Sequence, residues 1–314
     1  MWRFVRLVLG VVILAGVALA VWGGWRDDPP PALPAPLRGQ AMVAAAPAPA
    51  ARYGCGSAPA FAAAAAANGQ SLTTAPWSVF HRPETGWAVY APLAAHEIGT
   101  GCPGDAPGFA QALAAWQGGH GLAPSGIMDA ATLDALRIVW LSRRPFVIQT
   151  RGGVCPPGAS PGQLEFARPD EGYGGKPIQL TSGTLAAYRD LVAAARAESP
   201  EVRADPHLLQ IVSGFRDPDA AEASCLLLGD CGTPARANCS AHRTGMAMDL
   251  YLGAAPGFGP ASADDPNRLF LAATPAYGWL VRNAARFGFE PYPFEPWHWE
   301  WTGAEAPRGL GSQP

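Results

Sequence analysis

Residues 240–249 read SAHRTGMAMD, and this stretch is the most informative in the chain. It places an imidazole, His242, and a carboxylate, Asp249, seven positions apart with small residues between them, which let the backbone turn or pass close to a ligand. A second stretch, EPWHWEW at 295–301, adds another imidazole at His298. Two imidazoles and one carboxylate form the three-ligand set of a catalytic zinc ion, which keeps a fourth position for water.

Two further side chains supply the chemistry that a zinc-activated water needs. Glu295 lies three positions before His298, so it can move a proton near the metal without binding it. Arg216 ends the stretch SGFR and stays charged at all working pH values. Its fork of donors matches a carboxylate, and it can share the negative charge that develops during attack on a carbonyl.

In their order along the chain, SGFR at 213–216, SAHRTGMAMD at 240–249 and EPWH at 295–298 resemble the zinc D-alanyl-D-alanine carboxypeptidase family of the vancomycin-resistance type. Relatives in that family include D-Ala-D-Ala dipeptidases and phage L-alanyl-D-glutamate endopeptidases. The resemblance covers roughly residues 145 to 302. It implies these roles: zinc ligation by His242, Asp249 and His298, general base and acid catalysis by Glu295, binding of the substrate carboxylate or the oxyanion by Arg216, and substrate contact by Ser240.

The chain departs from the family pattern at one position. Many members carry Gln five residues after the arginine, where this chain has Ala221. A hydrogen bond to the substrate is therefore missing or is supplied by Glu222, and the exact specificity stays open.

An earlier region predicts a pair of helices. Phe109, Leu113 and Trp116 recur at helical spacing, a Pro-Ser-Gly turn follows at 124–126, and Asp129 can cap a second helix. The WQGGHGL stretch and the ATLDAL stretch around that turn resemble the small peptidoglycan-binding domain found beside cell-wall hydrolases. The resemblance implies that this region binds wall glycan or peptide; a plain helical hairpin is the alternative.

The order of elements after residue 144 favours an α+β fold. Thr181 or Ser182 can cap a helix that ends at Pro200, and Thr274 precedes another helix that Gly288 closes. The apolar run at 208–212 and the alternating run at 297–301 are typical of strands. The expected fold is a small antiparallel sheet with flanking helices that holds the zinc site, plus a small, mainly helical N-terminal domain.

Other side chains near the motifs have simpler interpretations. Trp297, Trp299 and Trp301 are expected to pack in the core rather than to form a substrate platform. Glu300 either orients a ligand histidine or faces solvent. His96 precedes Glu97, but the second histidine of a helical HExxH zinc motif is absent, because position 100 is Thr.

The N-terminus predicts export. Arg3 and Arg6 precede an apolar run at 7–25 that is long enough to span a bilayer. Ala18-Leu19-Ala20 resembles a signal-peptide cleavage site, but the run continues past it, so an uncleaved anchor in the inner membrane is favoured. Either way the chain reaches the periplasm or cell envelope, and the Pro/Ala-rich residues 27–51 form a spacer.

The six cysteines agree with export, because an even number in an exported chain suggests disulfides. Six cysteines allow 15 pairings, and the sequence does not choose among them. A Cys55–Cys102 clamp on the N-terminal domain is a guess.

The sequence therefore predicts an exported, Zn²⁺-dependent D-alanyl-D-alanine carboxypeptidase that trims peptidoglycan stem peptides. An endopeptidase that cuts cross-links or the L-Ala–D-Glu bond, and a wall-binding protein without activity, are the alternatives. The net charge of −3 gives no reason to expect nucleic acid as a partner. The predicted parts are a signal or anchor at 1–26, the spacer at 27–51, a peptidoglycan-binding-like domain at 52–143, a zinc peptidase domain at 144–303 and a tail at 304–314.

Overall fold

The computed structural model describes residues 54–78, 80, 82–219 and 239–303. All of them belong to one compact unit, which spans 47–314. Among these residues, no helix is both long enough and apolar enough to cross a membrane. Several predicted features lie outside the described residues: the anchor at 7–25, the spacer at 27–51, the tail at 304–314, and Ala221, Glu222, Cys225 and Cys231.

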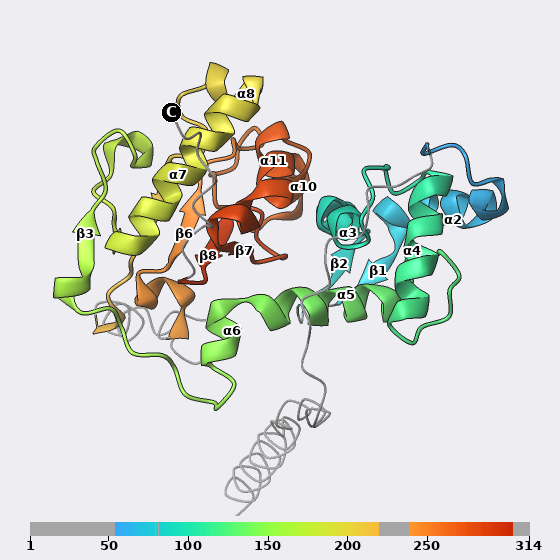
Figure 1. Cartoon of the computed structure of the whole chain (residues 1–314), viewed down its shortest axis with the longest axis horizontal. Helices are drawn as coiled ribbons and strands as arrows, with labels where there is room; N and C mark the ends of the chain where they lie inside the picture. The colour runs from blue at the N-terminus through green and yellow to red at the C-terminus, as the bar shows by residue number, and fades with distance from the viewer. Residues whose placement is uncertain (1–53, 79, 81, 220–238, 304–314) are drawn as a thin grey trace, which may run out of the picture. The chain divides into compact units, whose positions relative to one another are not determined.

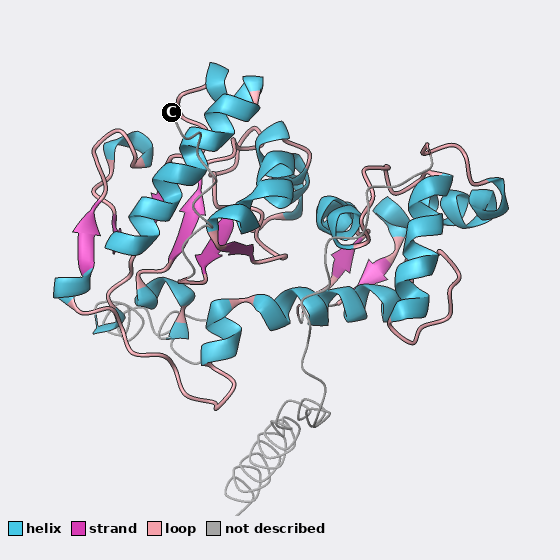
Figure 2. Ribbon diagram, in the orientation of Figure 1, coloured by secondary structure: helices cyan, strands magenta, loops and turns pink. Residues whose placement is uncertain are grey.

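The central element is a four-stranded sheet, shown in magenta in Figure 2. Its order is β5-β6-β8-β7, and every neighbouring pair is antiparallel. The strands are β5 (Ile211–Ser213), β6 (Ala247–Leu250), β7 (Phe289–Pro291) and β8 (His298–Trp301). A small antiparallel sheet with helices confirms the predicted α+β class.

Two helices of the C-terminal half, α7 and α11 in Figure 1, begin at the capping residues that the sequence indicates. The Thr181 hydroxyl accepts a hydrogen bond from the Thr184 N–H, and the Thr274 hydroxyl accepts one from the Tyr277 N–H. The elements are η3 (Pro161–Gln163), β3 (Leu164–Phe166), η4 (Tyr173–Gly175), β4 (Gln179–Thr181), α7 (Ser182–Glu198), α8 (Pro200–Ala204), η6 (Ala241–Thr244), α10 (Asp265–Ala272), α11 (Pro275–Asn283) and η7 (Ala284–Phe287). Gly288, at a φ of 78°, ends η7 as expected of a C-terminal glycine.

One strand begins later than predicted. The apolar run at 208–212 was expected to be extended throughout, but β5 begins only at Ile211. Leu209 adopts a φ of 69°, which no strand residue has. Its N–H donates to the Tyr251 carbonyl and its own carbonyl accepts from the Tyr188 hydroxyl, so buried hydrogen bonds hold it in a turn.

The N-terminal half contains the predicted helix pair as α4 and α5. The Asp129 carboxylate accepts a hydrogen bond from the Thr132 N–H at 2.8 Å, which confirms the predicted cap. Gly126 in the turn has a φ of 70°, and a Cβ there would lie 2.5 Å from the Ala110 carbonyl oxygen, so only glycine fits. The elements are η1 (Pro59–Phe61), α2 (Ala62–Thr74), β1 (Pro76–Trp77), β2 (Glu84–Thr85), η2 (Ala88–Tyr90), α3 (Ala91–Glu97), α4 (Pro107–Gly119), α5 (Ala130–Arg143) and α6 (Pro145–Gln149).

Two disulfides lie within the described residues. Cys55 pairs with Cys102, so the guessed clamp on the N-terminal region is present. Cys155 pairs with Cys239 across 84 positions of sequence.

The two halves share one hydrophobic core. A single cluster of buried side chains runs from Trp77 in β1 to Trp299 in β8. A polar contact crosses the same boundary: the Arg268 guanidinium, only 1% exposed, donates to the Glu84 carboxylate and to the Tyr90 hydroxyl. The domain boundary near residue 143 stays a prediction, and the packing across it is continuous.

Candidate metal centre

The register of the central sheet brings two predicted ligands together. Asp249 in β6 pairs directly with His298 in β8. Directly opposed residues in an antiparallel pair project from the same face. The His298 Nδ1 atom consequently lies 3.0 Å from Asp249 Oδ1.

His242 reaches the same place from the turn that leads into β6. It lies in η6, whose first turn is capped by the Ser240 hydroxyl accepting from the His242 N–H. Gly245 ends η6 with a φ of 66°, and a Cβ there would meet the Leu164 side chain at 2.9 Å, so a glycine is required. The turn leaves His242 Nε2 at 3.2 Å from Asp249 Oδ1.

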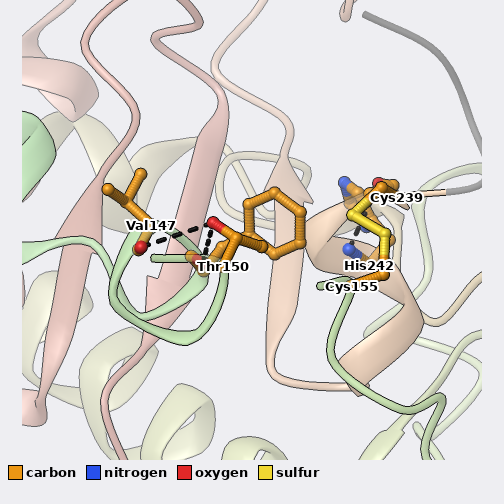
Figure 3. Close-up of a disulfide and its surroundings, with 7 residues drawn as sticks. Val147, Thr150, Cys155, Cys239 and His242 are labelled. Atoms are coloured by element: carbon orange, nitrogen blue, oxygen red, sulfur yellow. Dashed lines mark hydrogen bonds between the residues drawn. A yellow bond between two sulfur atoms is a disulfide. The ribbon is translucent and has the colours of Figure 1, made fainter. Parts of the chain in front are cut away.

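A disulfide holds the segment that carries this turn. Figure 3 shows the Cys155–Cys239 bond next to His242. The Ala159 N–H also donates to the Arg243 carbonyl at 2.8 Å, so the chain around residues 155–159 is linked both to η6 and to Cys239 just before it.

Hydrogen bonds select which nitrogen of each histidine is free for a metal. His242 Nδ1 lies 2.7 Å from the Gly214 carbonyl, an acceptor, so Nδ1 carries the proton and Nε2 presents a lone pair. His298 Nε2 lies 3.3 Å from Glu300 Oε1, which leaves Nδ1 facing Asp249. In both cases the far nitrogen is held by a second group, as in protein metal sites generally.

The three side chains fit a zinc ion. One ligand atom from each of His242, Asp249 and His298 lies within 4.8 Å of the others, and all three residues are buried. Tetrahedral zinc with bonds of about 2.0–2.1 Å separates its ligand atoms by roughly 3.3 Å. The contacts of 3.0 and 3.2 Å are close to that spacing, and two imidazoles with one carboxylate suit this metal.

The charges of the cluster follow from burial and mutual contact. Burial opposes ionisation of Asp249, but contacts with His242 and His298 hold its pKa well below the usual range. Burial lowers the pKa of His242. Burial also acts against His298, yet hydrogen bonds to Asp249 and Glu300 raise its pKa to about 9. His298 is therefore the more basic of the two imidazoles, and a metal ion must compete with a proton there.

Arg216 lies at the open side of the cluster. Ser213 of β5 pairs with Asp249, which places the following residues beside the cluster. The guanidinium contacts the Ser213 hydroxyl at 3.1 Å and Asp249 Oδ2 at 3.2 Å. Its side chain is 51% exposed, so it can bind a ligand that enters from solvent.

Glu295 lies on the short turn between β7 and β8. Its carbonyl accepts a hydrogen bond from the His298 N–H at 2.9 Å, which ties the turn to the ligand. Burial raises the pKa of Glu295, while His298 and Arg216 oppose the shift.

The family model of the D-alanyl-D-alanine carboxypeptidase VanY matches residues 232–304. That segment contains the whole candidate cluster together with Glu295. The C-terminal region is therefore similar to this family over that segment.

Two solved structures resemble parts of this chain. One is the LdcB LD-carboxypeptidase, at 22% identity and a TM-score of 0.33, with 47% of this chain and 72% of that chain covered. The other is a variant of the vancomycin resistance D,D-pentapeptidase VanY in complex with Zn(II), at 20% identity and a TM-score of 0.26, with 46% of this chain and 83% of that chain covered. No curated protein matches the chain.

The remaining side chains near the cluster settle two open points. Trp297 and Trp299 are 2% and 1% exposed, which confirms that they pack in the core. Trp301 packs against the same core and is partly buried. Glu300 is 2% exposed and bonded to His298, so of the two interpretations it is the orienting one that the structure supports.

Sequence reasoning missed Tyr292 and Arg144. The Tyr292 ring meets the His298 ring edge-on at 6.0 Å, and the Arg144 guanidinium stacks over Tyr292 at 3.9 Å. Arg144 had been interpreted only as part of a domain boundary. The available signal was a charged pair, Arg143-Arg144, placed directly before a proline, and nothing in the motifs connects that pair to the site.

Proposed function

We propose that the chain is an exported zinc-dependent D-alanyl-D-alanine carboxypeptidase that removes the terminal residue from peptidoglycan stem peptides. The observation that carries this proposal is that His242, from the turn η6, meets Asp249 and His298 of the paired strands β6 and β8 within the family-matched segment. Because the open position of such a site can hold a water molecule, the arrangement suits hydrolysis.

His242 Nε2, Asp249 Oδ1 and His298 Nδ1 would hold the zinc ion. When bound, zinc acts as a Lewis acid that lowers the pKa of a water molecule to about 7. The hydrogen bonds from His242 to Gly214 and from His298 to Glu300 keep both rings in the orientation that binding requires.

Glu295 is the proton carrier in this proposal. Its raised pKa brings proton exchange closer to neutral pH, where a general base and acid works best. It accepts the proton of the attacking water and later donates it to the nitrogen of the departing residue. Its position on the turn before His298 keeps it near the reaction and outside the ligand set.

Arg216 is the substrate-binding cation. The half-exposed guanidinium has one partner in Asp249 and one in Ser213, and its remaining donors are available for a peptide carboxylate. A free carboxylate at the end of the substrate would select carboxypeptidase over endopeptidase cleavage. Ser240 lies at the start of the His242 turn, and its proposed contact with the substrate would add to its capping role.

Mass spectrometry of products tests the activity. A stem pentapeptide ending in D-Ala-D-Ala should lose one terminal residue, the loss should stop with a zinc chelator, and the amidated pentapeptide should be a poor substrate. Equal cleavage of free-acid and amidated peptides would favour the endopeptidase alternative. A chain that binds zinc and releases no product from either peptide would favour a wall-binding protein without activity.

The proposed site of action is the periplasm or cell envelope, with residues 7–25 as an anchor in the inner membrane. The disulfides Cys55–Cys102 and Cys155–Cys239 support an oxidising compartment. Fractionation of cells should place the chain with the inner membrane and leave its C-terminal region accessible to protease added to the periplasm.

The N-terminal helices α4 and α5 are proposed to bind the wall. The inactive variant Glu295→Gln should pellet with insoluble peptidoglycan even when excess soluble stem peptide occupies the catalytic site. If soluble peptide releases the chain completely, all of the retention comes from the catalytic site and the wall-binding proposal fails.

A further inference from the structure

Glu300 is held by the residues at the junction of α5 and α6. Arg144 donates to Glu300 Oε1 through Nε at 3.0 Å and also through a terminal guanidinium nitrogen. The Phe146 N–H donates to the other oxygen, Oε2, at 2.9 Å. Arg144 is 8% exposed and Glu300 is 2% exposed, so this is a buried ion pair in which both carboxylate oxygens have donors.

The same carboxylate oxygen also contacts the predicted metal ligand. Glu300 Oε1 lies 3.3 Å from His298 Nε2. Because Arg144 and Phe146 fix the plane of the carboxylate, Oε1 is an acceptor at a fixed point beside the ring. With a metal bound, His298 would keep its Nε2 proton directed at Glu300 and present its Nδ1 lone pair to the metal.

Tyr292 completes the support for this chain of contacts. The Arg144 guanidinium stacks on one side of the Tyr292 ring at 3.9 Å, and the His298 ring meets Tyr292 at 6.0 Å with an interplanar angle of 85°. The guanidinium is thereby held by both an ion pair and a stacking contact, so its position has little freedom.

We propose that Arg144 is a positioning residue of the metal centre, which acts through Glu300 to fix the orientation and tautomer of His298. The inference rests on the proposed zinc function and extends it to a residue outside the matched segment. Arg144 touches neither the ligand atoms nor the open side of the cluster. Its contribution is to the affinity for the metal, and a matched neighbour, Arg143, provides the control.

Arg143, the last residue of α5, carries the same charge at the adjacent position and has a different partner. It donates to both oxygens of Glu97 at 2.7 and 2.8 Å and is 46% exposed. The variants Arg143→Gln and Arg144→Gln therefore remove one charge each from adjacent positions. Only the second should affect the metal.

The first measurement is the zinc dissociation constant of the full chain by competition with a chelator of known affinity. Groups that hydrogen-bond to the far nitrogen of a metal-bound histidine typically contribute about 10–100-fold to affinity. Arg144→Gln should weaken zinc binding by about that factor, Arg144→Lys should recover part of the loss, and Arg143→Gln should bind as the wild type does. The absorption spectrum of the Co²⁺-substituted chain should change in Arg144→Gln alone.

A double-mutant cycle with Glu300→Gln tests the route of the effect. If Arg144 acts through Glu300, adding Arg144→Gln to Glu300→Gln should cost little further affinity, because the pathway is already broken. Fully additive losses would overturn the proposal, and so would wild-type zinc affinity in Arg144→Gln. A wild-type chain that binds no zinc would instead refute the proposed function. Melting temperatures of all variants, with and without zinc, distinguish a loss of fold from a loss of affinity, since the Lys variant retains the buried charge.

Discussion

The strand pair β6–β8 and the N-terminal region from residue 54 to 143 contribute to the site in different ways. The strand pair carries Asp249 and His298 in direct register, so a short motif and a period of two suffice to build that part. The N-terminal region holds none of the clustered ligands, yet its Glu84 and Tyr90 bind the buried Arg268 of the C-terminal half. Short motifs thus determine the ligand residues, whereas the packing around them includes contacts between residues distant in sequence.

The largest expected effect comes from removing one of the predicted metal ligands. His242→Ala or His298→Ala should reduce bound zinc from one per chain to almost none and abolish activity, because two ligands cannot hold the ion tightly. Elemental analysis after dialysis measures the zinc content. His207→Ala is the matched control, since that imidazole is exposed and contacts only its local neighbours in α8–β5. Undiminished zinc in both ligand variants would contradict the assignment.

The next effect separates catalysis from ligation within the same region. Glu295→Gln should retain zinc and fold, while kcat falls by about 10²–10⁴-fold, the usual contribution of a general acid–base group. Steady-state kinetics on the D-Ala-D-Ala pentapeptide, with zinc content measured on the same sample, give the result. A variant that loses its zinc would show that Glu295 ligates the metal, and a variant with wild-type kcat would remove it from the mechanism.

Measurements of the free energy of unfolding test the contribution of the N-terminal region. Glu84→Gln removes the buried one of the two carboxylates that contact Arg268. Removal of one partner from a buried pair typically costs about 3–5 kcal/mol, and the half-exposed Asp265 reduces that cost. The exposed pair between Glu198 and Arg286 provides the control, because Glu198→Gln should cost less than about 1 kcal/mol. Calorimetry should show a single transition, since both halves share one core. Two separate transitions would show that the halves unfold independently.

The sequence was sufficient for the ligand-bearing elements and insufficient for their support. Spacing and capping residues predicted α4, α5, α7 and β8, and the motifs identified the three side chains that the fold brings together. The predicted start of β5 was wrong because tertiary hydrogen bonds hold Leu209 at positive φ. Local hydropathy carries no information on such bonds. The role of Arg144 at the predicted domain boundary could not be read from the sequence, because its partner, Glu300, lies 156 positions away.

The smallest effect lies where the two halves meet. Glu290 lines a cavity of about 80 Å³ together with Arg143, Trp140 and Phe289. Burial raises its pKa from the ordinary 4.5 to about 7, against the opposing charge of Arg143. Between these values the unfolded chain releases a proton that the folded chain keeps. Stability from this group is therefore complete below pH 4.5 and is lost as the pH rises through 7.

Glu290→Gln removes this titration. The melting temperature of the variant relative to the wild type should rise between pH 4.5 and pH 7 and then level off. The gain is at most about 3 kcal/mol, at roughly 1.4 kcal/mol for each pKa unit, and solvent in the cavity reduces it. Thermal unfolding of both chains at pH 5 and pH 8 measures the difference. An identical difference at the two pH values would mean that Glu290 ionises normally in the folded chain.

Direct pairing of Asp249 with His298 makes the register of the sheet and the metal site inseparable. A slip of β8 by one position against β6 would turn His298 to the opposite face, leaving Asp249 across from a tryptophan, Trp297 or Trp299. Only one alignment of the two strands can bind zinc with both side chains. A zinc ion present during folding would consequently stabilise that alignment relative to every misaligned one, and so favour the correct pairing of β6 with β8.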